Sequence, residues 1–406
     1  MSTLLRNSAW SLVAQGSKIC TQAGLFILLA RGFGVYEFGL YMAIFSISQL
    51  ISPLAGLGTH NTLIMRVSRY PRILPRYFWT PVISTFGTGI ILALAAFVFV
   101  QMIYKAAFWA VFSILLTEIV VYRLIDVVSN AWQALELLKK SSIIYFILSA
   151  SRVSVASILF LYNELSMFSW SVFNFLLTTI VLLFYSLEFF NKTSVKLLGL
   201  KFYPREIKKG IYFSFSGISQ AMSSNIDKVI LSRLVSISEV GIYSTAFRVV
   251  QMGIMPLMAV LQATYPIYFR EGKKGIDSSL KFSSRLSIPL ISYGIFAAIG
   301  IYFFSPIITF LLGSEYQRAV SYIKALAIFP LLQVFQYLLG EAITGAGYQK
   351  LRALVNLAVG VSGILLNILF VSLIGGQGAV LTLLIGEAML FLCYALIIFF
   401  LKKETS

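Results

Sequence analysis

Long apolar stretches follow one another along almost the entire chain, with short polar connectors between them. A helix needs about 20 consecutive, mostly apolar residues to cross a bilayer. The pattern therefore predicts an all-α polytopic membrane protein with twelve transmembrane helices, six in each half. We expect the spans at 8–31, 38–66, 80–104, 107–133, 141–162, 167–190, 210–233, 240–268, 284–312, 318–345, 349–373 and 377–401.

The two halves of the chain share a sequence segment. The stretch from Leu29 to Gln49 aligns with the stretch from Leu231 to Gln251 at an offset of 202 residues, half the length of the 406-residue chain. Duplicated halves are characteristic of membrane transporters, whose substrate sites lie between the repeats. We therefore expect two domains, an N-terminal six-helix bundle over 1–203 and a C-terminal one over 204–406.

Polar residues recur within the predicted spans at helical spacing. A charge at the bilayer centre costs about 2.5–3.5 kcal/mol, so these residues are expected to face the bundle interior or a watery cavity. Steps of three and four residues place each set on one helix face. The clearest sets are Asn7, Ser11, Gln15, Lys18 and Gln22; Glu118, Tyr122, Asp126, Ser129 and Gln133; Ser141, Tyr145, Ser149 and Arg152; and Ser216, Gln220, Ser223 and Asp227.

Three embedded cations are candidates for contact with an anionic substrate. Lys18, Arg152 and Arg248 fall near the middle of their spans, and no acid lies within four residues of any of them. An arginine guanidinium also binds a diphosphate better than a lysine ammonium does, because it offers paired N–H donors in a fixed plane. The full set of predicted substrate-binding residues is Lys18, Gln22, Arg123, Arg152, Gln220 and Arg248.

Embedded acids have two interpretations. Glu118, Asp227 and Glu387 are candidates for proton or sodium coupling. The alternative is that they form ion pairs with the embedded cations and hold the helices together. Arg123, with Asp126 one turn away, favours the ion-pair interpretation at that position.

The repeated segment falls at the outer hairpin of each half. Its arginine and glutamate, Arg31 with Glu37 and Arg233 with Glu239, favour a tight turn anchored at the membrane interface. The alternative is an outer gate in which these arginines and glutamates pair. Pro53 and Pro256, each about midway along the second span of its half, predict kinks that could act as hinges.

Composition agrees with the hydropathy pattern, since 59% of the residues are hydrophobic and 12% charged. The net charge of +17 would be typical of a nucleic-acid-binding protein, but 22 of the 32 Lys and Arg residues fall in the connectors on one side of the membrane. This is the positive-inside rule, which predicts that both termini are cytoplasmic and removes the argument for nucleic acid. Anionic membrane lipids are the expected partners of this basic face.

The chain lacks the motifs of an enzyme. It has no phosphate-binding G-x-x-x-x-G-K-[ST] loop and no H-E-x-x-H or G-x-S-x-G sequence. Its two cysteines lie in different halves and it has one histidine, His60, so no cluster of metal ligands is expected. We therefore expect no enzymatic activity, no cofactor, no metal and no catalytic residues.

Several segments resemble those of O-antigen and polysaccharide flippases. Residues Ala30–Tyr41 read A-R-G-F-G-V-Y-E-F-G-L-Y, similar to the family's A-R-x-L-G-x3-[YF]-G-x-Y signature, with Phe33 where leucine is usual. Asn7 and Trp10 match the N-x2-W opening, and G-A-G-Y-Q-K at Gly345–Lys350 resembles the region between the tenth and eleventh helices. The resemblance covers essentially the whole chain.

This resemblance implies a fold and a function. The fold is the V-shaped, MATE-like pair of six-helix bundles of the multidrug/oligosaccharidyl-lipid/polysaccharide exporter superfamily. The function is to move undecaprenyl-diphosphate-linked oligosaccharide, an O-antigen or capsule repeat unit, from the cytoplasmic to the periplasmic leaflet of the bacterial inner membrane by alternating access. A polysaccharide polymerase and a chain-length regulator are further expected partners.

Three alternatives stand beside this prediction. A cation-coupled exporter of drugs or other small molecules in the same superfamily would have an acid-dominated lumen, against which Lys18, Arg152 and Arg248 argue. A fourteen-helix flippase of peptidoglycan precursors would need another pair of spans. A membrane scaffold or polymerase partner would not require polar stripes in both halves.

Overall fold

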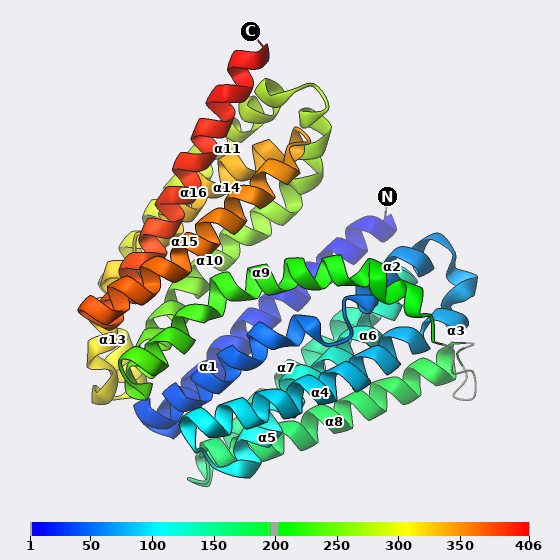
Figure 1. The fold of residues 1–406 in the computed structure, drawn as a ribbon, viewed down its shortest axis with the longest axis vertical. Coiled ribbons are helices and arrows are strands. Elements are labelled where there is room, and N and C mark those ends of the chain that lie inside the picture. The colour runs from blue at the N-terminus through cyan, green and yellow to red at the C-terminus, as the bar shows by residue number, and fades with distance from the viewer. Residues whose placement is uncertain (1, 194, 196–201, 406) are drawn as a thin grey trace. The chain divides into compact units, whose positions relative to one another are not determined.

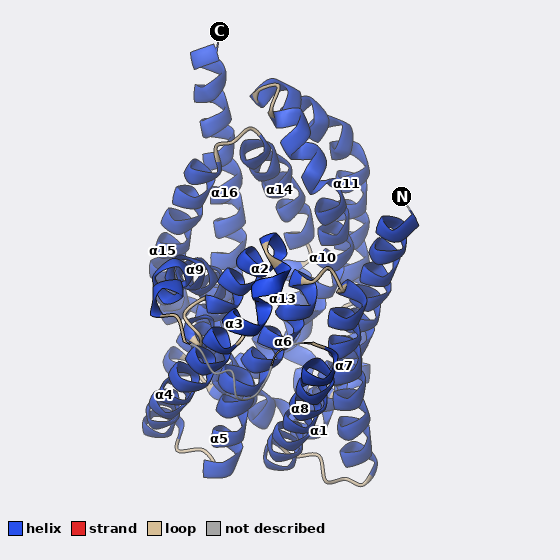
Figure 2. Cartoon of the chain, turned by 90° about the vertical axis from the view of Figure 1, so that its right-hand side faces the viewer, coloured by secondary structure: helices blue, strands red, loops and turns tan. Residues whose placement is uncertain are grey.

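The computed structural model describes the backbone of residues 2–193, 195 and 202–405. It describes side chains from residue 21 onward within these ranges, except at 69, 138, 216, 219, 223, 262, 263, 266, 404 and 405. All regular elements in the described ranges are helices (Figure 1, Figure 2). Contacts divide the chain into two units, Met1–Ile226 and Asp227–Ser406, and the boundary falls within helix α9 (Pro204–Leu234).

Among the described residues, nine helical stretches are long and apolar enough to cross a membrane, fewer than the twelve predicted. The first predicted pair, 8–31 and 38–66, is represented by one stretch. The predicted span 107–133 is not among the nine because the π-helical turn Thr117–Val121 divides it into helices of 9 and 13 residues. The predicted span 210–233 is not among them because its serines and charges make it too polar. The nine are Thr21–Leu54, Pro71–Tyr104, Lys139–Leu161, Met167–Lys192, Ile237–Leu261, Ile276–Phe304, Ser314–Gly345, Gln349–Ile374 and Gly376–Lys403.

The first unit begins with α1 (Ser2–Ile51), which contains a sharp break at Gly34. Gly34 has φ of 70°, a conformation that glycine adopts without steric penalty. The break falls between the predicted spans 8–31 and 38–66. It therefore turns one continuous run of helical residues into two helices of opposite direction (Figure 1).

The second predicted span is itself interrupted. After α1 comes a short 3-10 turn, η1 (Ser52–Leu54), and then a non-helical segment that leads to α2 (Thr59–Arg69). Pro53 lies in η1, where its missing N–H and its ring oppose continuation of the α-helix. Gly56 and Gly58 follow with φ of 79° and 69°.

The other helices of the first unit form a bundle whose core is rich in aromatic side chains. Phe78 stacks on Phe189 with ring centroids 4.6 Å apart, and Trp132 meets Phe189 edge-on at 5.1 Å. These elements are η2 (Pro71–Ile73), α3 (Leu74–Tyr77), α4 (Trp79–Tyr104), α5 (Phe108–Leu116), η3 (Thr117–Val121), α6 (Tyr122–Ala134), α7 (Leu138–Leu161) and α8 (Met167–Lys192).

The N-terminal end of α9 is fastened to this bundle. Glu206 accepts two hydrogen bonds from the Arg66 guanidinium, at 2.7 and 3.3 Å. Tyr203, just before α9, stacks on Tyr77 with ring centroids 4.8 Å apart. The backbone of α9 also passes so close to the non-helical segment that a Cβ at Gly210 would collide with the carbonyl of Leu57.

The second unit is also an all-helical bundle. Two serines of α11 bind the backbone of α14: Ser279 donates to the carbonyl of Ala342 at 3.0 Å and Ser283 to that of Leu338 at 2.9 Å. Pro256 lies exposed within α10, which continues as a helix through it. The elements are α10 (Ile237–Gly272), α11 (Ile276–Phe304), α12 (Ile307–Leu312), η4 (Ser314–Tyr316), α13 (Gln317–Leu326), α14 (Phe329–Gly345), α15 (Gln349–Ile374) and α16 (Gly376–Thr405).

Candidate functional site

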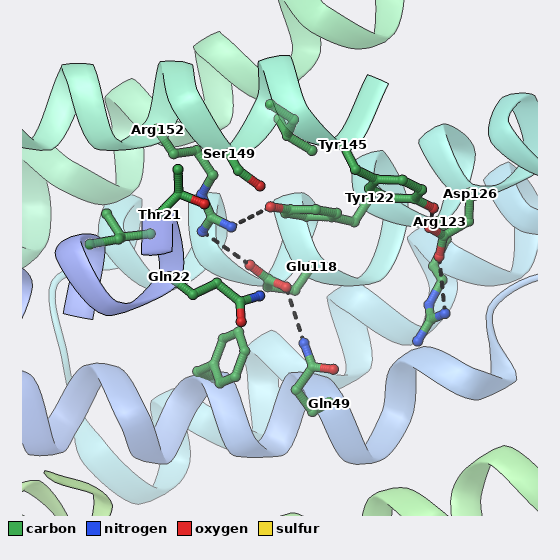
Figure 3. A pocket seen from close by; sticks show the side chains of 13 residues that line it. Thr21, Gln22, Gln49, Glu118, Tyr122, Arg123, Asp126, Tyr145, Ser149 and Arg152 are labelled. Carbon is green, nitrogen blue, oxygen red and sulfur yellow. Dashed lines mark hydrogen bonds and ion pairs between the residues drawn. The ribbon is translucent and has the colours of Figure 1, made fainter. Parts of the chain in front are cut away.

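The first unit has a partly open cavity of about 370 Å³ between α1, η3, α6 and α7 (Figure 3). Both charged and aromatic side chains line it, and it is the candidate functional site. Its walls are Thr21, Gln22, Leu25, Phe45, Gln49, Glu118, Tyr122, Arg123, Asp126, Tyr145, Leu148, Ser149 and Arg152.

At one end of the cavity, Glu118 lies between Arg152 and Gln49 (Figure 3). Glu118 Oε1 is 3.8 Å from Arg152 Nη2, and Glu118 Oε2 accepts a hydrogen bond of 3.1 Å from Gln49 Nε2. The glutamate is 7% exposed. A buried carboxylate of this kind needs both a counter-charge and hydrogen bonds, and it obtains one of each.

The Arg152 guanidinium lies between two aromatic rings. Its Cζ is 5.2 Å from the ring centroid of Tyr122 and 5.6 Å from that of Trp170, and Nη1 donates a hydrogen bond to the Tyr122 hydroxyl. Arg152 Nε is buried and has no hydrogen-bond partner among the described residues. The cation is thus held by aromatic faces, one hydrogen bond to Tyr122 and one long ion pair, and its Nε donor is unused.

At the other end of the cavity, Arg123 and Asp126 are fully engaged. Arg123 Nη1 lies 3.1 Å from Asp126 Oδ2, and Nη2 donates to Ser52 Oγ at 2.7 Å. Asp126 Oδ1 accepts a further bond of 2.5 Å from Tyr145. This pair connects η1, α6 and α7, which agrees with the ion-pair interpretation of the sequence.

Glu118 stands on an unusual backbone. The helix from α5 to α6 widens to a π-helical turn over Thr117–Val121, the element η3. Such single π turns occur often at functional sites, because the extra residue re-aims the side chains around it. The neighbouring α4 approaches η3 closely at Gly89, where a Cβ would press on the carbonyl of Ile119 at 3.3 Å.

The structure brings together four residues that the sequence singled out. Gln22, Glu118, Arg123 and Arg152 all line the cavity. Gln220 does not line it and is exposed on α9. Arg248 is half-buried on α10 of the second unit. The side chain of Lys18 lies outside the described residues.

The embedded acids of the second unit have partners within that unit. Asp227 Oδ1 is 3.1 Å from Lys228 Nζ, and its other oxygen accepts a hydrogen bond from Tyr243. Glu387 Oε1 accepts from Gln333 Nε2 at 3.2 Å, while its buried Oε2 has no partner among the residues the structure describes.

The glutamates of the two repeated hairpins lie at corresponding places in the two halves. Glu37 Oε2 accepts a hydrogen bond of 3.0 Å from the backbone N–H of Met167, the first residue of α8. In the second unit, a Cβ at Gly376, the first residue of α16, would collide with the Glu239 carboxylate. Each glutamate therefore lies at the N-terminus of the last helix of its own half, where the helix dipole favours negative charge.

Arg31 and Arg233 of these hairpins are exposed. Glu239 has its ion pair with Arg318 instead, at 3.1 Å, and it accepts a hydrogen bond from the Tyr322 hydroxyl. Within each unit, these contacts fasten the hairpin to neighbouring helices.

Sequence reasoning missed several contributors to the site. Gln49 was part of the repeated segment and Tyr122 of a polar stripe, but neither was selected as a site residue. Trp170, fully buried, carried no signal beyond its hydrophobicity. Among the described residues no three of His, Cys, Asp or Glu gather as they would around a metal ion.

Comparison with known proteins identifies the family. Residues 4–271 match the model of the polysaccharide biosynthesis protein family, and residues 213–369 match the MatE model. No curated protein sequence is similar to the chain at a significant level.

Solved structures of related fold cover nearly the whole chain. An inward-facing multidrug resistance MATE family transporter of the MOP superfamily is 15% identical, with a TM-score of 0.77 over 98% of this chain and 96% of that one. The outward-facing form of such a transporter is 16% identical, with a TM-score of 0.65 and the same coverage of 98% and 96%. A MOP superfamily transporter from Pyrococcus furiosus, described as having a binding pocket of reverse polarity, is 14% identical with a TM-score of 0.65, again over 98% and 96% of the two chains.

Family and fold agree with the resemblance seen in the sequence, and the fold is that of a multi-pass membrane protein. The chain belongs to the polysaccharide biosynthesis protein family and has a MATE-like fold.

Proposed function

We propose that this protein is a flippase that moves undecaprenyl-diphosphate-linked oligosaccharide, an O-antigen or capsule repeat unit, from the cytoplasmic to the periplasmic leaflet of a bacterial inner membrane. It would do so with twelve helices in two six-helix halves, 1–203 and 204–406, by alternating access and with both termini cytoplasmic. Membership in the polysaccharide biosynthesis family supports the substrate class. A polymerase and a chain-length regulator are the partners that such a pathway supplies.

The observation that carries the proposal is the state of Arg152. This arginine stands near the middle of the membrane-crossing stretch Lys139–Leu161 and lines a cavity. Its long contact with Glu118 and its unused Nε leave a cation able to bind an anionic head group. Arginine binds diphosphate oxygens through paired N–H donors, and Tyr122, Gln22 and Ser149 add polar groups for a glycan.

The main alternative is a cation-coupled exporter of drugs or small molecules of the same superfamily. The Pyrococcus furiosus transporter shows why pocket polarity matters here, since its reverse polarity is described as suggesting a different function. In the present cavity the acids do not dominate: Glu118 and Asp126 are matched by Arg152 and Arg123. An exporter of cations would leave at least one acid unpaired in the empty cavity.

Complementation of a deletion strain tests the proposed site. Arg152→Ala and Arg248→Ala should each stop surface polysaccharide assembly while the protein level in the membrane is unchanged. Arg285→Ala, which removes an exposed arginine of α11, is the matched control and should complement fully. Normal polysaccharide from both test variants would remove these arginines from the substrate site.

A further inference from the structure

The two ion pairs of the cavity differ in how firmly each arginine is held. Arg123 has a close contact of 3.1 Å to Asp126 and a second bond to Ser52. Arg152 reaches Glu118 at 3.8 Å and donates a hydrogen bond to Tyr122, and its Nε has no partner among the described residues. The first pair is close and is tied to η1 and α7 by further hydrogen bonds. The contact between Arg152 and Glu118 is longer, so we expect that it can be exchanged for another anion.

Glu118 has a second contact that can keep it in place if it loses Arg152. Gln49 donates to its Oε2 at 3.1 Å, and Gln49 also lines the cavity. The π-helical turn of η3 holds the glutamate at the wall of the cavity, close to where a ligand of Arg152 would lie. Departure of Arg152 would leave a buried carboxylate with one hydrogen bond and no counter-charge, a state that strongly favours protonation.

We propose that Glu118 occupies the place of the substrate's diphosphate on Arg152 in the empty transporter, and that diphosphate binding displaces it and makes it take up a proton. This inference rests on the proposed function, because it assumes an anionic head group in the cavity. The carboxylate and the diphosphate compete for one guanidinium, so neutralising the carboxylate strengthens diphosphate binding. By linkage, the bound diphosphate strengthens proton binding to the same extent.

The groups around Glu118 are consistent with this exchange. Among the residues whose side chains the structure describes, the charged groups that act on it are Arg152 on α7 and Arg123 and Asp126 on α6. Tyr122 on α6 and Tyr41 on α1 lie beside Arg152. Since Arg123 and Asp126 neutralise each other, Arg152 is, of these three charges, the one that favours the ionised form of Glu118. The consequence is that the transported anion and a proton enter the cavity together.

Binding of inorganic pyrophosphate to the purified protein in lipid nanodiscs tests the inference. Calorimetry in buffers of different ionisation enthalpy gives both the dissociation constant and the protons taken up. Pyrophosphate itself titrates, so variants are compared with the wild type at the same pH. The variants are Glu118→Gln, which keeps the hydrogen bond to Gln49, Arg152→Ala, and Glu341→Gln as the control. Glu341 is a buried acid paired with Arg352 at 3.1 Å outside the cavity.

The expected result has two parts. At mildly basic pH, Glu118→Gln should bind pyrophosphate about tenfold more tightly than the wild type, within the usual range of coupling between two ligands. The proton uptake seen with the wild type should be absent from Glu118→Gln and kept in Glu341→Gln. The measurement on the wild type stands even if a variant folds poorly.

Other outcomes separate the inference from the function on which it rests. If Arg152→Ala abolishes binding while Glu118→Gln binds and takes up protons like the wild type, the exchange is refuted and the anionic site remains. If pyrophosphate does not bind, or binds equally well to Arg152→Ala, both the exchange and the proposed head-group site are refuted.

Discussion

Arg152 and Arg123 lie in one cavity and on neighbouring helices, yet their surroundings suit different tasks. Arg123 binds Asp126 and Ser52, and its removal would leave the half-buried Asp126 without this counter-charge. Arg152 lies between aromatic rings, donates a hydrogen bond to Tyr122 and forms a longer ion pair with Glu118, which by our proposal leaves it able to bind a ligand. The same side chain therefore serves structure in one place and recognition, by our proposal, in the other.

Glu37 shows how a residue of the repeated segment stabilises its half. Its carboxylate accepts the first backbone N–H of α8 at 3.0 Å. Glu37→Ala should lower the free energy of unfolding by about 1.5–3 kcal/mol, the value of a hydrogen bond to a charged group. Thermal unfolding of the purified protein in detergent measures this. Glu164→Gln, at an exposed glutamate of the loop before α8, should change little, and equal losses from both variants would refute the capping role.

At the scale of single elements, the backbone of α9 packs very closely against the non-helical segment that follows η1. A Cβ at Gly210 would meet the backbone of Leu57, Gly58 and Thr59. Gly210→Ala should therefore destabilise the protein by about 1–3 kcal/mol through overpacking. Gly87→Ala, at a glycine of α4 with open space around it, should be neutral or slightly stabilising. Thermal unfolding of both variants tests this prediction. Equal stability of Gly210→Ala and the wild type would contradict the close packing.

Hydropathy predicted the helical elements well where a span is uniformly apolar. It did not predict the interruptions at η1 and η3, because both lie within apolar runs and average hydropathy does not report the local backbone conformation. Pro53 was recognised as a breaker, but a kinked helix was expected where the structure has a 3-10 turn and a non-helical segment. The π turn at Glu118 has no sequence signature at all.

The polar face of each helix around the cavity could be predicted from the sequence, but the contacts between these helices could not. Helical spacing placed Glu118 and Arg152 each on a polar face. It could not show that these two residues, 34 positions apart, face each other, since pairing between helices depends on the packing of the bundle. A search for acids within four residues therefore made Arg152 seem unneutralised. Gln49 was overlooked because it belonged to a segment interpreted as a hairpin.

At the scale of the whole molecule, the duplication is visible in contacts made inside each unit. Glu37 and Glu239, matched by the 202-residue offset, each lie at the start of the last helix of their half. The polar cavity described above belongs to the first unit, and no counterpart of Arg152 follows from the offset, since position 354 is a leucine. The two halves therefore share the position of the hairpin glutamate at the start of their last helix. They differ in the residues that we propose for substrate recognition.

Accessibility of the cavity separates a transporter from a membrane scaffold. In a background lacking Cys20 and Cys393, cysteines at Gln22 and Ser149 should react with a membrane-impermeant thiol reagent added from one side of the membrane. A cysteine at Thr178, fully buried in α8, should not react. Protection of both cavity positions from both sides would contradict transport through this cavity.

The most direct measurement of the central claim is the leaflet in which lipid-linked oligosaccharide accumulates when the gene is deleted. The account predicts accumulation on the cytoplasmic leaflet, loss of surface polysaccharide, and correction of both by the wild-type protein but not by Arg152→Ala. Accumulation on the periplasmic leaflet, or normal surface polysaccharide in the deletion strain, would contradict it.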